Sequence, residues 1–336
     1  MGSVGTSGAI LVSSFLSLGF TPGSPRRRKV TERPFSLPPR LARWLDASSS
    51  TFERLFRGKG PLTPPWRVRR YVGYFDDPRE YERSAALQVS GLRSAGVLTP
   101  TTSVLDVGCG SGRIASALAT YLTRGTRYEG LDPQPVPIRW CRDNLSTRFP
   151  NFHFHETGTY SPKYNPQGRE RPEDYRFPFE GRQFDLVLLL SVLTHVSREV
   201  EERLLRESER VLSEGGSIAM TEYLLTEETR RPVESGLSTP RFPYPLGEDR
   251  SETPGSPEGF VVRDSRWARS LWGGLGLSVE RWERGSWAGR GFESSFTSKY
   301  SFFQDLLVLR RGEPEGSEER RDSLPPEAQR AALPRG

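Results

Sequence analysis

A short glycine-rich segment has the most chemically informative spacing in the chain. In VLDVGCGSGRIA, residues 104–115, the acid Asp106 lies two residues before Gly108, which opens a Gly-x-Gly-x-Gly run. Glycines at a strand-to-helix turn let a ligand lie against the backbone, because a side chain there would block it. A second acid, Asp132, follows the last of these glycines by 20 residues, the spacing expected of an acid that binds ribose hydroxyls. The pattern predicts a nucleotide-type ligand at the carboxyl ends of parallel strands.

The positions of the glycines distinguish two classes of cofactor. A dinucleotide-binding loop follows Gly-x-Gly-x-x-Gly, and its third glycine would fall at Arg113 of this chain. The tighter run found here suits a ligand that has no pyrophosphate. Asp132 does not discriminate, because both classes need an acid for the ribose. A strand–turn–helix junction packed without any ligand is the structural alternative, and an acid on a buried strand beside three glycines disfavours it.

Strand and helix patterns alternate through the middle of the chain, which is typical of a parallel sheet covered by helices. The helix after the fourth strand is expected to begin at a Ser197 cap and to end at Gly215 and Gly216. The sequence predicts an α/β, Rossmann-like, doubly wound, mostly parallel seven-stranded sheet with a C-terminal antiparallel strand pair. The expected strands are residues 103–108, 127–132, 151–156, 184–191, 217–225, 277–282 and 301–310.

The positive charge of the chain is concentrated near its beginning. The net charge is +6, but residues 21–70 hold 13 basic residues against three acids, so the rest of the chain is mildly acidic. Only four of the 48 basic residues are lysines. This predominance of arginine is better explained by the base composition of the genome than by phosphate recognition. Nucleic acid is therefore a disfavoured partner.

Two further features bear on localisation. Cys109 and Cys141 have no spacing typical of a disulfide framework or a zinc site, which favours a reducing cytoplasm. The apolar residues 8–20 are too few to span a bilayer and lack a basic segment before them, so no membrane association is expected.

The segment LDVGCGSG resembles motif I of the class I S-adenosylmethionine-dependent methyltransferases, and Asp132 resembles the acid of their motif II. The resemblance extends through FDLVLLLSVLTHV to SFFQDLLVLR and is greatest to bacterial methyltransferase-domain proteins. It implies a methyltransferase domain over residues 85–312, with 226–260 as a lid or disordered insertion. The expected flanks are a disordered segment 1–37, a basic helical extension 38–84 with amphipathic helices from Leu41, and a disordered tail 313–336.

The same resemblance implies S-adenosylmethionine as the cofactor. Ser191 is expected near the transferable methyl group. Relatives often carry an acid after the third strand for the adenine amino group, whereas this chain has Gly158 there. The backbone, or neighbours such as Thr157 and Thr159, must then hold adenine. The expected cofactor-binding residues are Asp106, Gly108, Cys109, Gly110, Ser111, Gly112, Asp132, Pro133 and Ser191.

Methyl transfer from a sulfonium needs in-line alignment more than dedicated catalytic groups. His195, which follows the fourth strand, is the candidate catalytic residue, either as a general base or to position the acceptor. Its alternative role is to cap the following turn or to pack against the cofactor. No metal is expected, because His153 and His155 alternate with phenylalanines and so share one face of a strand.

The acceptor is expected to be a small molecule methylated on oxygen or nitrogen. Enzymes that methylate exocyclic amines of nucleobases or glutamine commonly carry an Asn/Asp-Pro-Pro-aromatic motif after the fourth strand, where this chain has SVLTHV. Three alternatives stay open: an NAD-dependent oxidoreductase, a noncatalytic S-adenosylmethionine-binding protein, and a nucleic-acid methyltransferase that uses the basic segment. The identity of the acceptor and the oligomeric state do not follow from the sequence.

Overall fold

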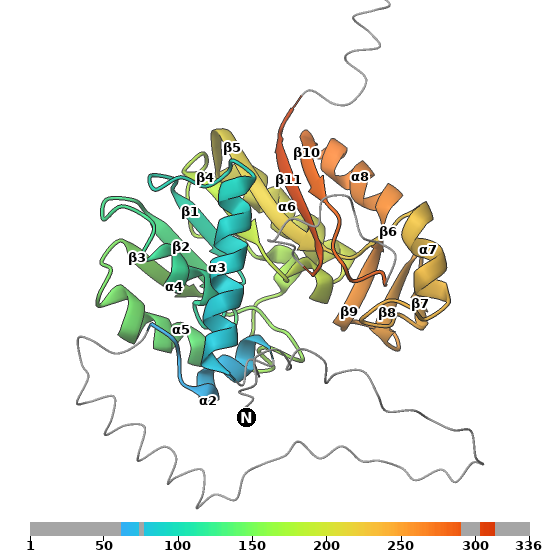
Figure 1. Ribbon diagram of the computed structural model, residues 1–336, viewed down its shortest axis with the longest axis horizontal. Helices are drawn as coiled ribbons and strands as arrows, with labels where there is room; N and C mark the ends of the chain where they lie inside the picture. Colours follow the sequence, from blue (N-terminus) through green and yellow to red (C-terminus); the bar gives the residue numbers. More distant parts are fainter. Residues whose placement is uncertain (1–61, 74–76, 290–302, 313–336) are drawn as a thin grey trace, which may run out of the picture. The chain divides into compact units, whose positions relative to one another are not determined.

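The computed structural model describes residues 62–73, 77–289 and 303–312 (Figure 1). The chain divides into two units, and all described residues belong to the second, Phe56–Gly336. The amphipathic helices expected from Leu41, most of the loop after Gly289 and the two terminal segments expected to be disordered lie outside the described residues.

A seven-stranded sheet forms the centre of this unit, in the order β10-β11-β5-β4-β1-β2-β3. The strands β1 to β5 of this sheet pair in parallel, whereas β11 runs antiparallel to both β5 and β10. The predicted fold class is therefore confirmed. The strands are β1 (Val104–Val107), β2 (Tyr128–Asp132), β3 (Phe152–Glu156), β4 (Phe184–Leu189), β5 (Leu212–Glu222), β10 (Leu277–Glu283) and β11 (Asp305–Arg311).

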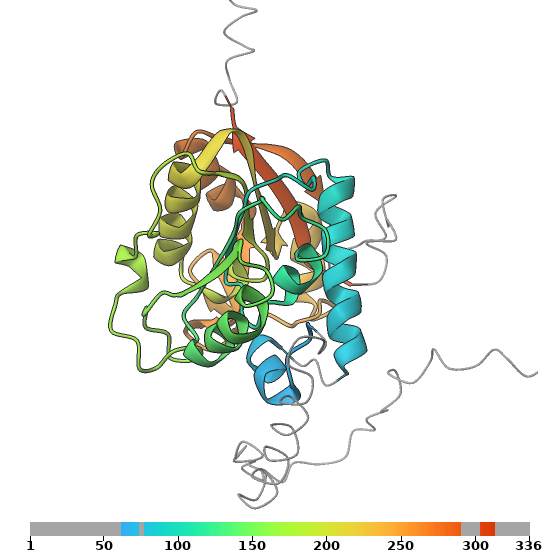
Figure 2. The ribbon, with the colours of Figure 1, turned by 90° about the vertical axis from the view of Figure 1, so that its left-hand side faces the viewer.

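Helices cover both faces of the sheet, as Figure 2 shows for α3 on one side and α6 on the other. The central strand β4 explains why: Leu186 and Leu188 belong to one buried apolar cluster, and Val187 and Leu189 to another. Alternate side chains of a strand point to opposite faces, so a continuous apolar run needs a helix layer on each. The first layer consists of α3 (Pro78–Ser94), α4 (Arg113–Leu118) and α5 (Pro135–Cys141), and the second of α6 (Arg198–Val211) and α8 (Ser265–Gly274).

The junction between α6 and β5 differs from the sequence prediction. Ser197 caps α6 as expected, but the helix ends at Val211, not at Gly215 and Gly216. The prediction of the helix end was wrong because these glycines lie in a bulge of β5. Leu212 pairs with Phe184 and Ser217 with Leu186, so four residues of β5 oppose one of β4, and Gly215 adopts a φ of 72°.

Residues 226–260, for which the sequence showed no periodicity, contain a helix and most of a second sheet. The four strands of this sheet lie in the order β6-β9-β8-β7. Its strands β7 and β8 are short and partly exposed, and the first five residues of β9 are only half-buried, which leaves little apolar alternation in the sequence. Thr226 caps the helix through a reciprocal bond with Thr229. The elements are β6 (Leu224–Leu225), α7 (Glu227–Glu234), β7 (Tyr244–Leu246), β8 (Asp249–Thr253) and β9 (Ser256–Asp264).

A buried arginine ties this second sheet to α6. Arg263 of β9 lies 2.7 Å from the Glu201 carboxylate and 2.8 Å from that of Asp249, and all three side chains are at most 3% exposed. Arg198 of α6 also donates to Asp249, at 2.7 Å and 2.9 Å. Because buried charges need partners, these ion pairs fix the position of the sheet.

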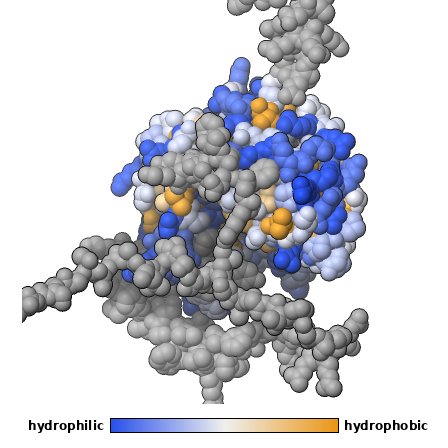
Figure 3. Space-filling view, turned by 45° about the vertical axis from the view of Figure 1, so that its right-hand side comes forward, coloured by the Kyte–Doolittle hydropathy of each residue, from blue (hydrophilic) through white to orange (hydrophobic). Residues whose placement is uncertain are grey.

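The surface around the second sheet is mostly hydrophilic. Figure 3 brings this side forward and shows only small, separate hydrophobic patches. Within the part of the chain that the structure describes, no helix has the length and apolar composition needed to cross a membrane.

Candidate active site

The glycine loop between β1 and α4 has the backbone conformation that only glycine adopts freely. Gly108, Gly110 and Gly112 have φ values of 75°, 53° and 76°. A Cβ atom at Gly108 would overlap the side chain of Val192, and one at Gly110 would overlap that of Val72. The loop therefore packs between the segment after β4 and the N-terminal part of the described chain.

Asp132 lies at the end of β2, beside this loop. Its Oδ2 accepts a hydrogen bond from the Gly110 N–H at 2.8 Å, and its Oδ1 accepts one from the Gln134 N–H at 2.9 Å. Burial raises the pKa of the carboxyl to about 6, although both hydrogen bonds oppose that rise. The structure thus brings together the glycines and the second acid that the sequence singled out, and Pro133 follows as a half-buried residue.

Asp106 lies on β1, below the loop, and is 3% exposed. The hydroxyl of Tyr128 donates a hydrogen bond to its Oδ2 at 2.7 Å. Burial raises the pKa of Asp106 to about 7, partly offset by this bond. The carboxyl is therefore more easily protonated than an exposed aspartate and is held in place by β2.

The remaining loop residues contact neighbouring elements. The N–H groups of Gly108 and Cys109 both donate to the Leu131 carbonyl, at 2.7 Å and 3.0 Å. The Ser111 side chain is fully buried and lies 3.0 Å from the hydroxyl of Tyr81, on α3. Tyr81 was not predicted as a site residue, because the sequence around it shows only the spacing of an amphipathic helix.

The N-terminal segment also contacts the loop, through α2 (Trp66–Arg69) and the 3₁₀ turn η1 (Arg70–Val72). The Gln134 side chain donates to the Tyr71 carbonyl at 3.4 Å. The helix α3 then crosses residue 85, where the sequence placed the start of the methyltransferase domain. The described part of the expected basic extension therefore packs directly on the candidate site.

Gly158 follows β3 and lies close to Asp132 along the sheet edge. The Thr157 N–H donates to the Asp132 carbonyl at 3.1 Å. The hydroxyls of Thr157 and Thr159 lie 2.8 Å apart. A carboxylate is nevertheless nearby: Glu170 Oε1 lies 3.5 Å from where a Cβ of Gly158 would lie. Glu170 is 12 residues away in sequence, in a loop without a motif, so no sequence pattern pointed to it.

Ser191 lies just beyond β4 and has a φ of 61°, a strained value for a residue other than glycine. Its N–H donates to Thr221 Oγ1 and its hydroxyl to Gln304 Oε1, both at 2.8 Å. Thr221 also donates to Gln304, at 2.6 Å. Gln304, which directly precedes β11, therefore fixes the strained turn, and sequence reasoning assigned it to a strand.

His195 ends the 3₁₀ turn η4 (Leu193–His195), which packs against β9. Its Nδ1 bonds to the Gly259 carbonyl and lies 3.3 Å from that of Glu258. A carbonyl only accepts, so Nδ1 carries the proton and Nε2 carries the lone pair. Burial, and to a smaller extent the nearby Lys163 ammonium, lower the pKa of His195 to about 4. The imidazole is therefore neutral at physiological pH, with a lone pair available on Nε2.

The other two histidines lie beside an acid at the β3 edge of the sheet. His155 Nε2 lies 2.6 Å and His153 Nδ1 lies 3.3 Å from the carboxylate of Glu129, on β2. Both histidines lie on the more exposed face of β3, as their alternation with phenylalanines predicted. Among the described residues, no three His, Cys, Asp or Glu side chains form a group that could hold a metal ion.

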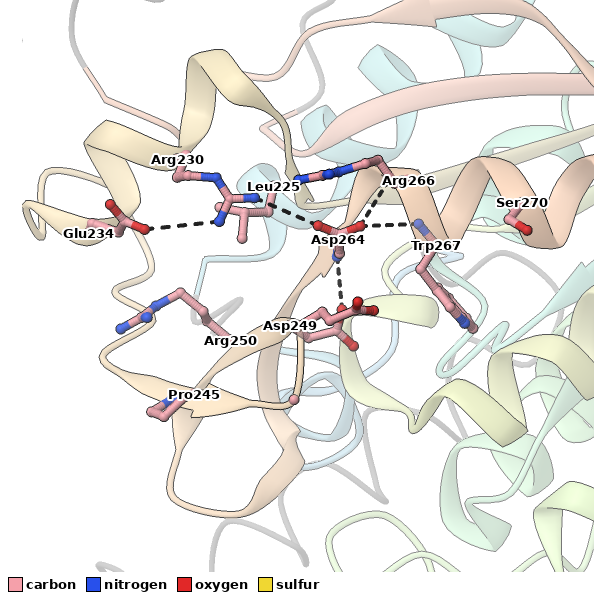
Figure 4. A pocket seen from close by; sticks show the side chains of 12 residues that line it. Leu225, Arg230, Glu234, Pro245, Asp249, Arg250, Asp264, Arg266, Trp267 and Ser270 are labelled. Carbon is pink, nitrogen blue, oxygen red and sulfur yellow. Dashed lines mark hydrogen bonds and ion pairs between the residues drawn. The ribbon is translucent and has the colours of Figure 1, made fainter.

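A separate hollow of about 590 Å³ lies between α7, the β7–β8 turn and the start of α8 (Figure 4). None of its lining residues belongs to the glycine loop. Arg230 lies 3.7 Å from Asp264 and 4.0 Å from Glu234, and the Asp264 N–H donates to Asp249 at 2.8 Å. Because these charges pair with one another, we assign no ligand to this hollow.

A known family matches the central part of this fold. Residues 105–220, from β1 to β5, match the model of a family described as a methyltransferase domain. The chain carries a class I S-adenosylmethionine-dependent methyltransferase domain. The match includes the whole glycine loop, Asp132, Ser191 and His195, whereas the N-terminal segment and the second sheet lie outside it.

Several solved structures resemble the chain at low sequence identity. One is the PH0226 protein of Pyrococcus horikoshii OT3, with 18% identity, a TM-score of 0.46 and coverage of 74% of this chain and 98% of that one. Another is the 1,6-didemethyltoxoflavin-N1-methyltransferase of Burkholderia thailandensis, with 14% identity, a TM-score of 0.44 and coverage of 84% and 94%. A third is the magnesium protoporphyrin IX methyltransferase of Synechocystis PCC 6803, with 16% identity, a TM-score of 0.41 and coverage of 79% and 95%.

Proposed function

We propose that this methyltransferase domain transfers a methyl group from S-adenosylmethionine to an oxygen or nitrogen of a small molecule. The observation that carries the proposal is the close association of the glycine loop with Asp132 at the carboxyl ends of β1 and β2. The absence of an Asn/Asp-Pro-Pro-aromatic motif after β4 supports a small molecule over a nucleobase as acceptor.

The residues present fit this cofactor. A carboxylate oxygen has two lone pairs, and each oxygen of Asp132 accepts one backbone N–H. The Gln134 side chain also bonds to this carboxylate, so three of its four lone pairs are used and one remains for a ribose hydroxyl. Pro133 adjoins the same position. The methionine end would lie along the glycine loop, beside Asp106, Gly108, Cys109, Gly110, Ser111 and Gly112.

The adenine end follows from the order of the strands. With the methyl group beside Ser191, just after β4, and the ribose at β2, as proposed here, the rest of the elongated cofactor would extend toward β3, the next strand of the sheet. Glu170 presents a carboxylate there, next to Gly158. We propose that this carboxylate accepts a hydrogen bond from the adenine amino group, in place of the acid that this chain lacks.

The chain's own residues align and deprotonate the acceptor. When bound, the cofactor supplies an electrophilic methyl group on a positively charged sulfur. The acceptor atom forms a bond to the methyl carbon as the sulfur–carbon bond breaks, so the sulfur becomes neutral and the acceptor proton must leave. His195 Nε2 is the candidate to receive that proton, and Ser191 is the candidate to orient the acceptor.

Replacement of the ribose acid tests the cofactor assignment. Asp132→Ala should weaken binding of S-adenosylhomocysteine at least tenfold in calorimetric titrations, because a hydrogen bond to a charged group is worth about 1.5–3 kcal/mol. Asp143→Ala removes an exposed carboxylate from the neighbouring turn and should leave affinity unchanged. Equal affinity of folded Asp132→Ala and the unaltered protein would rule the assignment out.

A further inference from the structure

Aromatic rings from four separate segments form a continuous group after β4. The group, here called the aromatic wall, consists of Tyr164, His195, Phe260 and Tyr223. The His195 ring lies 4.6 Å from that of Phe260 and 5.8 Å from that of Tyr164, and Phe260 lies 5.8 Å from Tyr223. His195 of the wall follows Val192 by three residues, and the Val192 side chain packs against Gly108 of the glycine loop.

The wall is not simply part of the hydrophobic core. Tyr164, His195 and Phe260 are only partly buried, whereas Tyr223 closes the wall on its buried side. Phe303, whose ring lies 6.4 Å from that of Tyr223, is 47% exposed. Partly exposed rings at the carboxyl end of a parallel sheet lie where this fold class binds its ligands.

Polar groups border the wall on both sides. On one side, Gln304 accepts hydrogen bonds from Ser191 and Thr221 at the strained turn. On the other, Lys163 Nζ lies 5.1 Å from the ring centre of Tyr164 and 6.0 Å from that of Phe260, and donates to the Glu258 carbonyl. A mostly aromatic surface with a few directed polar groups is typical of a site for a small organic ligand.

The composition of the wall indicates the class of acceptor. Ring faces pair most favourably with other planar rings, in offset or edge-to-face geometry. A small aliphatic amino acid or amine offers no ring to these faces. We propose that the methyl acceptor is a planar aromatic molecule, whose ring lies on the aromatic wall and whose hydroxyl or amino group points toward Ser191 and His195. This inference rests on the proposed methyl transfer and adds the acceptor class.

Matched planar and non-planar probes test the proposal. The full chain, saturated with S-adenosylhomocysteine, is titrated with 3,4-dihydroxybenzoate and with shikimate, which has a carboxylate and hydroxyls on a non-planar ring. A second pair is 2-naphthol and decahydro-2-naphthol. Binding is measured by saturation-transfer NMR and calorimetry. We expect at least one planar probe to bind about tenfold or more tightly than its non-planar partner, since aromatic pairs contribute beyond the area they bury.

Variants locate the binding on the wall. Phe260→Ala and Tyr164→Ala should each remove most of the planar preference, and Phe260→Tyr should keep it. Two ring deletions are used because Phe260 lies in a strand of the second sheet, whereas Tyr164 lies in a loop. Tyr244→Ala, which removes an exposed ring on β7, should leave the preference unchanged.

The outcomes separate this proposal from the proposed function. If S-adenosylhomocysteine itself does not bind the unaltered chain, the methyltransferase proposal fails. If it binds but neither planar probe is preferred, or if the preference survives both Phe260→Ala and Tyr164→Ala, only the aromatic acceptor is overturned.

Discussion

The proposed cofactor half of the site, around the glycine loop and Asp132, and the proposed acceptor half, around Ser191 and His195, differ in how far apart along the chain their residues lie. In the cofactor half, Gly110 with Asp132 and Asp106 with Tyr128 are both 22 residues apart, within one strand–helix–strand unit. In the acceptor half, Ser191 bonds to Gln304 across 113 residues, and His195 to Gly259 across 64. Local sequence therefore specifies the cofactor half, whereas the acceptor half exists only once the sheet and the second sheet have assembled.

This difference has a consequence for stability. The cofactor half is held mainly by backbone hydrogen bonds of the loop and by buried strands. The acceptor half depends on a second sheet that is attached through buried charges. Removal of one of these buried charges should therefore disturb the whole acceptor half, whereas the glycine loop should keep its conformation.

The largest effect is expected at His195, once an acceptor is known. His195→Ala and His195→Gln should each lower turnover about a hundred- to ten-thousand-fold, the usual contribution of general acid–base catalysis. Affinity for S-adenosylhomocysteine should not change, because His195 bonds to the second sheet and not to the glycine loop. Steady-state kinetics and calorimetry on the same preparations measure both. A loss below threefold in both variants would make His195 a structural residue.

Next in size is the loss of the buried arginine. Arg263→Met leaves the carboxylates of Glu201 and Asp249 buried without this cation, which typically costs about 3–5 kcal/mol of unfolding free energy. Thermal and urea unfolding measure the change. Arg231→Met, on the exposed side of α7, is the matched control and should change stability little. A change below about 1 kcal/mol for Arg263→Met would show that the second sheet does not depend on this arginine.

The preference for adenine over a base that lacks its amino group tests the proposed contact between adenine and Glu170. Replacement of the adenine amino group by an oxygen, as in S-inosylhomocysteine, removes the donor that Glu170 is proposed to meet. The protein should bind S-adenosylhomocysteine about tenfold more tightly than this analogue, and Glu170→Gln should reduce the ratio. Glu156→Gln, on the last residue of β3, is the control. If Glu156→Gln abolishes the selectivity and Glu170→Gln does not, the assignment belongs to Glu156.

The smallest effect is a dependence of cofactor affinity on pH. Burial raises the pKa of Asp132 to about 6 in the free protein. Ribose hydroxyls donate to the ionised carboxylate, so binding favours ionisation and a proton must first leave at low pH. Affinity for S-adenosylhomocysteine should therefore fall as pH drops below 6, by about tenfold between pH 7 and pH 5. Calorimetry across this range checks the slope, and Asp132→Asn, which cannot titrate, should remove the part that Asp132 contributes and leave only that of Asp106, whose pKa burial also raises.

Much of the cofactor half could be predicted from the sequence, because its signals are local. The glycines of the loop indicate residues with positive φ values. Asp132 is recognisable as an acid at the end of the second strand, at the expected spacing from the glycine loop. Likewise, the continuous apolar run of β4 indicates a strand that is buried on both faces, and β4 lies in the middle of the sheet. These features depend on neighbouring residues and on the geometry of a single strand–helix–strand unit.

The acceptor half could not be predicted to the same extent. Gln304 was assigned only to a strand, and tertiary pairing brings it to Ser191. Glu170, proposed for the adenine end of the cofactor, is an exception in the cofactor half, because it lies in a loop without a motif. Gly215 and Gly216 gave a misleading signal, because a glycine pair after a helix is equally suited to a helix end or to a strand bulge. In residues 226–260, the only fully buried residues of β8 are Asp249 and Ser251, and Asp249 is held by an ion pair with Arg263, so the strand lacks the apolar alternation on which strand prediction depends.

Calorimetric titration of the full chain with S-adenosylmethionine, S-adenosylhomocysteine and NADH tests the central claim most directly. The glycine loop and Asp132 predict one-to-one binding of the first two ligands, with no measurable binding of NADH. Tight binding of NADH without binding of S-adenosylmethionine, or no binding of any of the three, would contradict the assignment of the glycine loop as an S-adenosylmethionine site.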